Sequence, residues 1–144
     1  MKWLTKMTLM VVLGLSLPAF AGDIPAKLYR NPNCGCCDEY AKYLKAHGYE
    51  VELISTYDIS AIKTRYQVPK RLEGCHTAVI AGYVFEGLIP VQSIDRVLKE
   101  RPKIQGLSLP GIPTGAPGMP GNKKGPLEVY YLKDSVKPQV YETY

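Results

Sequence analysis

Residues 26–48 read AKLYRNPNCGCCDEYAKYLKAHG, and this segment constrains the fold more than any other part of the chain. Its first five residues, 26–30, predict a short strand. Asn31-Pro32-Asn33 supplies turn residues, and the turn leads directly into Cys34-Gly35-Cys36-Cys37. We therefore expect a strand, a turn and a helix in immediate succession, with the cysteines at the start of the helix.

The residues after Cys37 have the pattern of an amphipathic helix. Asp38 and Glu39 fall in its first turn, where carboxylates interact favourably with the positive end of the helix dipole. A core-facing stripe recurs at i, i+3, i+4 and i+7. Its members are Tyr40, Tyr43, Leu44 and His47. Gly48 ends the helix in the left-handed conformation, and His47 has a structural role in the last turn, where a histidine stabilises the dipole.

Downstream of this helix the sequence predicts further strands and two more helices. Strands are expected at residues 50–55, 77–81 and 83–88, with Gly82 turning the chain between the last two. Asp58 caps a short helix, and a longer one covers residues 93–100. Their inward-facing side chains are Ile59, Ile62 and Tyr66 in the first and Ile94, Val97 and Leu98 in the second. The order β-α-β-α-β-β-α predicts an α/β fold, a thioredoxin-like mixed sheet with flanking helices.

A shift in composition separates these elements from the C-terminus. Eleven of the 21 residues from Gly106 to Pro126 are glycine or proline, as in a disordered linker. Residues 127–130 and 139–141, however, predict the strands of a C-terminal hairpin. Because the segment also carries apolar side chains and is held at both ends, we expect it to wrap across the domain as a loop.

The first 21 residues have the features of a cleavable signal peptide. Lys2 and Lys6 precede an apolar run at 7–17, and Ala19-Phe20-Ala21 matches the small-x-small cleavage pattern. A run of about 11 residues is shorter than the ~20 that a membrane-spanning helix needs. We therefore expect cleavage after Ala21, leaving residues 22–144 as one soluble domain in the periplasm; a short membrane anchor is the alternative.

The charge and the motif content exclude several classes of function. The formal net charge is +5, the leader contributes two of the lysines, and the other basic residues are scattered, so no nucleic-acid-binding surface is indicated. The chain has no Ser/His/Asp set, phosphate-binding glycine loop or paired carboxylates, so hydrolysis and phosphoryl transfer are not indicated. A binding protein is expected, and an oxidoreductase is the enzyme class that stays open.

Three of the four cysteines lie at the start of the first helix. Cys34 and Cys37 have the C-x-x-C spacing of thiol–disulfide oxidoreductases, and Cys36 adds a third sulfur between them. A helix N-terminus lowers thiol pKa values from ~8.5 toward ~4–7. Thiolates bind metals and attack disulfides, so this position promotes either chemistry.

The fourth cysteine lies in Gly74-Cys75-His76-Thr77, just before the third expected strand. In thioredoxin-like folds this loop lies against the C-x-x-C motif and usually carries a cis-proline. Here a sulfur replaces that proline, so part of the groove that holds a substrate peptide is missing. Four soft ligands in one pocket suit a thiophilic metal ion.

Three interpretations of the cysteines compete. Structural disulfides, expected in an exported protein, would have to be Cys34–Cys37 and Cys36–Cys75, because the 34–36 and 36–37 pairs are too close for relaxed bridge geometry. Those bonds would crowd one end of the domain. An oxidoreductase would use Cys34 and Cys37 but leaves the other two cysteines unexplained. The sequence favours metal binding.

The crowding of the sulfurs distinguishes between metals. Zinc prefers a closed tetrahedron built from separated pairs of ligands. Here three sulfurs fall within four residues, and Cys36 and Cys37 point in different directions from the helix start. Thiolates that bridge two ions relieve this problem, and Cu(I) accepts such bridging readily. The spacing therefore indicates a multinuclear copper cluster.

Residues 29–37 (Tyr-Arg-Asn-Pro-Asn-Cys-Gly-Cys-Cys), Gly74-Cys75-His76-Thr77 and Pro117-Gly118-Met119 closely resemble the CopG-type family of periplasmic copper-resistance proteins. This family was long known as a metal-binding domain of unknown function. The likeness extends from about Ala26 to Tyr144. It implies copper ligands at Cys34, Cys36, Cys37 and Cys75, with a thioether from Met119. A second methionine common in the family is Ile112 here, so no metal is expected at that position.

The role of His76, next to Cys75, has three alternatives. It is a metal ligand, a hydrogen-bond partner of a ligand, or a residue that starts a strand. The expected function is copper resistance, with copper held as Cu(I) by the thiolates and a redox-active cluster as a further option. The expected partners are copper ions and other periplasmic copper-export or oxidase proteins.

The position of signal cleavage is directly testable. We expect the protein recovered from the periplasm to begin at Gly22, because the small-x-small pattern ends at Ala21. Intact-mass spectrometry of the exported protein measures this. A full-length chain in the membrane fraction would instead support the anchor.

Overall fold

The computed structural model describes residues 23–144. The predicted signal peptide, residues 1–21, lies outside the described residues. Among the helices of the described part, none is both long enough and apolar enough to cross a membrane.

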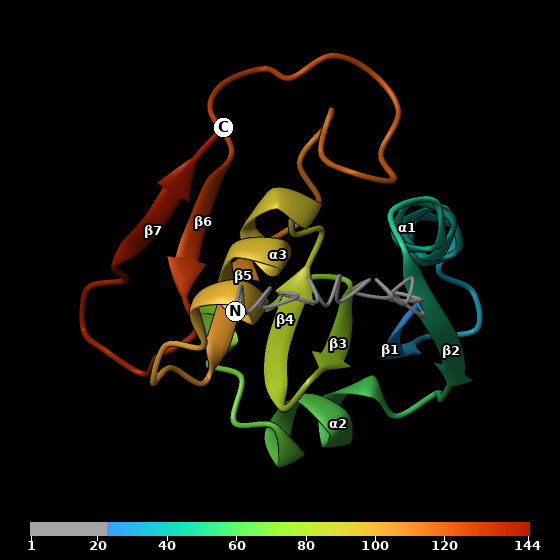
Figure 1. Cartoon of the computed structure of the whole chain (residues 1–144), viewed down its shortest axis with the longest axis horizontal. Helices are drawn as coiled ribbons and strands as arrows, with labels where there is room; N and C mark the ends of the chain where they lie inside the picture. Colours follow the sequence, from blue (N-terminus) through green and yellow to red (C-terminus); the bar gives the residue numbers. More distant parts are fainter. Residues whose placement is uncertain (1–22) are drawn as a thin grey trace, which may run out of the picture.

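The described residues form one seven-stranded mixed sheet (Figure 1). Its strands are β1 (Ile24–Arg30), β2 (Tyr49–Ser55), β3 (His76–Ile80), β4 (Tyr83–Gly87), β5 (Gly106–Leu109), β6 (Glu128–Tyr131) and β7 (Val140–Thr143). They follow the order β2-β1-β3-β4-β5-β6-β7. The pairs β1–β2 and β4–β5 are parallel and the remaining neighbours are antiparallel. The expected mixed α/β class and the C-terminal hairpin, β6 and β7, are confirmed.

Three α-helices and one short 3-10 helix pack on the sheet. They are α1 (Gly35–Ala46), α2 (Ile59–Arg65), η1 (Lys70–Leu72) and α3 (Val91–Glu100). Tyr40 and Leu44 of α1 and Ile94 of α3 share one core cluster with the sheet. A second, smaller cluster contains Leu72 of η1 and Val84 of β4. Because strand side chains alternate between faces, α1 and α3 cover one face and η1 the other.

The segment at 106–109 corrects the sequence interpretation. These residues were expected to begin the glycine- and proline-rich loop, but they form β5, which pairs with β4 on one side and β6 on the other. Leu107 and Leu109 are buried in the main core. Four residues are too few to show a strand pattern against a Gly/Pro background, so the pairing comes from the neighbouring strands.

Two helices also differ from expectation. The helix expected at 93–100 begins at Val91, directly after Pro90, whose ring fixes a backbone angle suited to a helix start. In α2, Asp58 caps the helix as expected, accepting a hydrogen bond from the Ala61 backbone. The expected buried face of α2 is wrong: Ile59 and Ile62 are only half-buried, and the buried residue is Lys63.

The remaining Gly/Pro-rich residues, 110–126, run from β5 toward α1 and return to β6 (Figure 1). Gly118 lies against the first turn of α1: a Cβ there would be 2.8 Å from the Tyr40 nitrogen and 3.1 Å from the Cys36 carbonyl oxygen. Its φ is +84°, a conformation that side-chain-bearing residues rarely adopt. Glycine at this position therefore lets the loop contact the helix backbone.

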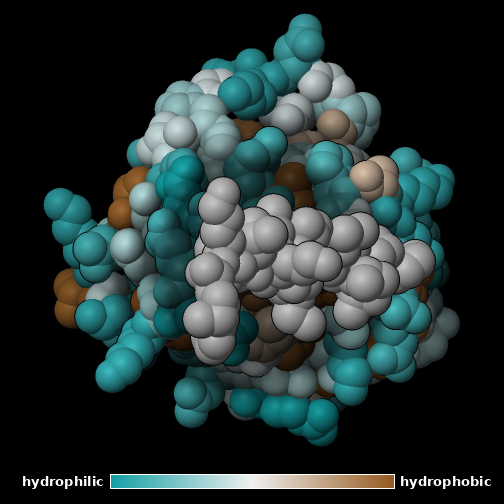
Figure 2. Space-filling view, in the orientation of Figure 1, coloured by the Kyte–Doolittle hydropathy of each residue, from teal (hydrophilic) through white to brown (hydrophobic). Residues whose placement is uncertain are grey.

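Figure 2 shows that the surface coloured by hydropathy is mostly hydrophilic in this view. The hydrophobic areas visible there are separate from one another. Large contiguous apolar patches mark partner or membrane surfaces. The visible described residues carry no patch of that kind.

We expect Gly106→Ala to lower the free energy of unfolding by about 1–3 kcal/mol, a typical penalty for overpacking. A Cβ at Gly106 would lie 1.7 Å from the Val84 carbonyl oxygen, so β4 and β5 would have to separate. Denaturant unfolding measures the change. Gly125→Ala is the matched control because no atom lies within 4 Å of its added Cβ. Equal stability of the two variants would contradict the close approach.

Candidate metal centre

The register of β1 and β3 brings the two cysteine-bearing segments together. These strands are antiparallel, and Arg30 at the end of β1 pairs with His76 at the start of β3. The chain that leaves β1 toward Cys34 therefore starts beside the chain that enters β3 from Cys75. Residues 41 positions apart in sequence thus meet at one edge of the sheet.

The turn between β1 and α1 is fixed by its own hydrogen bonds. The Asn33 backbone donates to the Asn31 side chain at 2.9 Å, and the Cys34 backbone donates to the Asn31 carbonyl at 3.0 Å. The Arg30 guanidinium donates to the Pro32 carbonyl at 2.9 Å and pairs with Asp38 at 2.9 Å. The turn is thus tied to both β1 and α1, which sets the direction of the first helical turn.

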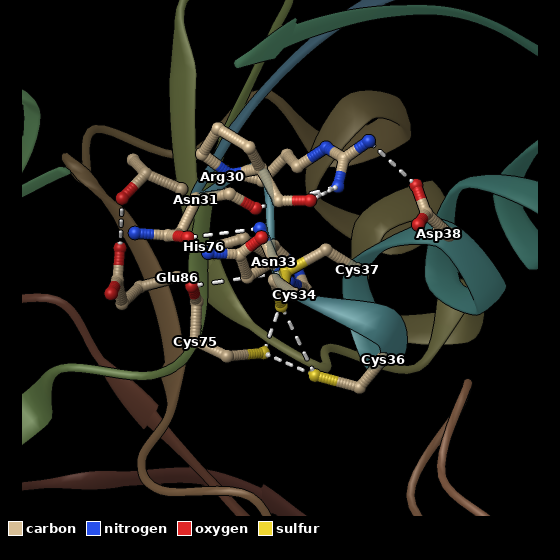
Figure 3. Close-up of a disulfide and its surroundings, with 12 residues drawn as sticks. Arg30, Asn31, Asn33, Cys34, Cys36, Cys37, Asp38, Cys75, His76 and Glu86 are labelled. Atoms are coloured by element: carbon tan, nitrogen blue, oxygen red, sulfur yellow. Dashed lines mark hydrogen bonds and ion pairs between the residues drawn. A yellow bond between two sulfur atoms is a disulfide. The ribbon is translucent and has the colours of Figure 1, made fainter. Parts of the chain in front are cut away.

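The four sulfur atoms lie together at this helix start (Figure 3). The Sγ atom of Cys36 is 3.4 Å from that of Cys34 and 3.3 Å from that of Cys75. With Cys37 included, all four Sγ atoms are within 4.8 Å of one another. Cys37 is buried and the other three are half-buried. This geometry can hold a metal ion and leaves a route to it from solvent.

A disulfide joins Cys34 and Cys37, whereas Cys36 and Cys75 are free thiols. The Cys34–Cys37 bond, which both the structural and the oxidoreductase interpretations require, is therefore present. The Cys36–Cys75 bond, which the structural interpretation also requires, is absent. A site that uses all four sulfurs as thiolates requires reduction of the Cys34–Cys37 bond. Residues 23–144 contain no cis peptide bond, so no cis-proline accompanies Cys75.

The surroundings of Cys75 make its thiol a weaker acid. Burial, together with the contact to Cys36, raises the pKa of the Cys75 thiol to about 12. The nearby positive charge of Lys63 acts in the opposite direction but is the weaker influence. Cys75 is therefore a protonated thiol at neutral pH, and a metal ion that binds it must displace that proton.

His76 is fully buried beside the sulfur group. Its Nδ1 atom is 3.2 Å from the Cys75 Sγ, and its ring stacks on Tyr40 with centroids 4.5 Å apart. Burial, and then the charge of Lys63, lowers the pKa of His76 to about 3, so the ring is neutral at physiological pH. His76 also begins β3. It is thus both a strand-start residue and a hydrogen-bond partner of Cys75.

Met119 lies over α1 on the Gly/Pro-rich loop. It is half-buried, packs against the main core and lines one surface hollow with Glu39 and Tyr43. Its neighbour Gly118 contacts the backbone at Cys36. The loop therefore carries the thioether to the same helix end as the sulfurs. Ile112, at the position of the family's second methionine, is 53% exposed.

Sequence reasoning missed a buried ion pair behind Cys75. Lys63 of α2 pairs with Glu86 of β4, and both side chains are almost completely buried. The Thr77 hydroxyl and the Gly74 backbone donate to the same carboxylate. A charged residue inside the apolar strand run at 83–88 was the one available signal, because buried carboxylates are rare unless paired.

Taken together, the fold and the site define a mixed α/β protein with a four-cysteine candidate metal centre. Residues 72–119, from η1 through Cys75 to Met119, match the family described as "Protein of unknown function, DUF411". No match was found among curated proteins.

Two solved structures are similar over most of the chain. Both are described as the copper resistance protein CopG, in Form 2 and Form 1, and each is 36% identical in sequence. Each match covers 85% of this chain and 98% of the other, with TM-scores of 0.77 and 0.76. The chain belongs to the CopG copper-resistance family, as its motifs indicated.

The redox state of the site can be measured by counting thiols. We expect two reactive thiols per denatured, unreduced chain and four after reduction, because Cys34 and Cys37 are joined and the other two are free. Titration with a thiol-reactive dye under denaturant gives both values. A count of zero before reduction would show that Cys36 and Cys75 are also oxidised.

Proposed function

We propose that this protein binds copper as Cu(I) through Cys34, Cys36, Cys37 and Cys75, and that it acts in copper resistance. The observation that carries the proposal is the meeting of four Sγ atoms within 4.8 Å. Similarity to CopG, described as a copper resistance protein, supports copper as the metal. Soft thiolate ligands favour Cu(I) over the harder divalent ions.

The crowding of the sulfurs supports a multinuclear cluster. Cys36 and Cys37 are adjacent in α1, and Cys36 lies 3.3–3.4 Å from two other sulfurs. Thiolates shared between copper ions let such closely packed sulfurs all act as ligands. The metal is the cargo of this site, and the chain's part is to hold the four sulfurs in a fixed arrangement, with Cys75 releasing its proton as the metal binds.

Two further donors lie next to the sulfurs. Met119 would supply a thioether from the loop, supported by the contact of Gly118 with the first turn of α1. His76 would hold Cys75 through its Nδ1 atom or bind copper through its neutral ring. The loop has Ile112 in place of a second methionine and offers no donor there.

The proposed place of action is the periplasm. It follows from the signal peptide pattern at residues 1–21, with residues 22–144 as the mature copper-binding domain and 106–126 as its Gly/Pro-rich region. Proteins that export copper or oxidise it in the periplasm are the proposed partners. An exported copper-binding protein would receive Cu(I) at this site and pass it on.

A thiol–disulfide oxidoreductase is the second candidate, and the Cys34–Cys37 disulfide at the helix N-terminus favours it. Cys34 is half-buried and Cys37 is buried, the usual arrangement of an attacking and a resolving cysteine. Two features weaken this candidate. Cys36 and Cys75 crowd the bond, and no cis-proline shapes a groove for a substrate peptide.

Anaerobic titration of the fully reduced protein with Cu(I) separates the two functions. We expect more than one Cu(I) per chain, and we expect Cys75→Ser to lower the bound copper sharply while circular dichroism shows an intact fold. Met119→Leu should weaken binding less, with Ile112→Leu in the same loop as its control.

The opposite outcome is equally clear. Absence of Cu(I) binding by the reduced protein would contradict the proposed function. Insulin reduction that survives both Cys36→Ser and Cys75→Ser would establish the oxidoreductase instead.

A further inference from the structure

A buried carboxylate lies directly behind the segment that carries Cys75. Glu86 belongs to β4, its side chain has no solvent exposure, and it pairs with the almost fully buried Lys63 of α2. Buried ion pairs seldom add stability relative to apolar residues of the same size, because both charges lose their hydration. Stability alone therefore does not account for this buried pair, and its other contacts indicate a further role.

The two carboxylate oxygens of Glu86 hold the two ends of one short segment. Oε1 accepts a hydrogen bond from the Gly74 backbone at 2.9 Å, and Oε2 accepts one from the Thr77 hydroxyl at 2.6 Å. Between these anchors lie Cys75 and His76. Figure 3 shows Glu86 beside the Cys75 segment, on the side away from α1. One side chain thus fixes the residues on either side of a sulfur in the cluster.

Close backbone packing keeps the carboxylate at this distance. A Cβ on Gly74 would lie 2.5 Å from the Cα of Gly87, the residue after Glu86. Gly87 has a φ of +77° and lies against the Leu109 carbonyl oxygen. Because neither glycine has a side chain, the end of β4 directly contacts the Cys75 segment. Glu86 can therefore reach the Gly74 amide.

We infer that Glu86, with Lys63 as its counter-ion, is a positioning residue that sets Cys75 against the three cysteines of α1. The inference rests on the proposed copper site and names the part of the fold that orders it. Groups that orient metal ligands typically change metal affinity 10–100-fold when they are removed. Lys63 neutralises the carboxylate, so that Glu86 can accept both hydrogen bonds without leaving an unpaired buried charge.

Two double variants separate positioning from stability. Lys63→Met with Glu86→Leu removes the charges and the hydrogen-bond acceptor together. Lys63→Met with Glu86→Gln removes the charges but keeps an amide oxygen for the Gly74 backbone. Thermal unfolding of both variants reports the fold. Thr77→Val, which leaves the ion pair and deletes one anchor, serves if the Leu variant does not fold.

Cu(I) affinity of the reduced proteins, measured by competition with bicinchoninate, is the first readout. We expect the Leu double variant to bind at least about 10-fold more weakly than the wild type, and the Gln double variant to stay much closer to it. Thr77→Val should weaken binding in the same direction by less. Equal affinity of both folded double variants and the wild type would overturn the inference.

A metal-free readout keeps this test independent of copper. In the reduced protein with Cys34 and Cys37 changed to serine, diamide takes two hydrogens from the Cys36 and Cys75 thiols and joins them as a disulfide. Their sulfurs are 3.3 Å apart, so closure should be fast, and several-fold slower in the Leu variant than in the Gln variant. Unchanged closure rates would refute positioning by Glu86 even in a protein that binds no Cu(I).

Discussion

The antiparallel pairing of Arg30 with His76 is the contact on which the rest of the site depends. It sets the end of β1 beside the start of β3, so a helix that begins after β1 and a loop that precedes β3 must meet. The turn at residues 31–33 is held by hydrogen bonds that Arg30 donates and Asn31 accepts, and these set the direction in which α1 begins. Four sulfurs at one sheet edge follow from this register.

The four cysteines have two oxidation states that differ by two electrons, and each state supports a different chemistry. With Cys34 and Cys37 joined, the site is a disulfide with two thiols beside it. With that bond reduced, four soft donors face one another within 4.8 Å. With the disulfide present, burial raises the pKa of the Cys75 thiol, so metal capture at this residue is coupled to release of its proton.

The structure holds the cysteine segments from two opposite sides. On one side, Gly118 of the 110–126 loop lies against the backbone of α1 and brings Met119 to the helix. On the other, the Glu86 carboxylate holds Gly74 and Thr77, and Lys63 of α2 balances its charge in a direct ion pair. Both contacts need glycine at the point of approach, because a Cβ at Gly118 or Gly74 would overlap a neighbouring backbone. Glycine therefore occupies the positions where the loop backbone contacts α1 and where the Cys75 segment contacts the end of β4.

The sequence alone determined the local features: the strand–turn–helix unit at 26–48, the Asp58 cap, the mixed α/β class, the hairpin and the family motifs. These follow from periodicity and turn chemistry, which act over a few residues. Tertiary structure decided what depends on distant partners. β5 at 106–109 exists because β4 and β6 lie on either side of it. Lys63 of α2 is buried because Glu86 of β4 faces it. The local sequence predicts that a lysine on a short helix is solvent-exposed. Its burial depends on a counter-ion 23 residues away, and no local pattern identifies that partner.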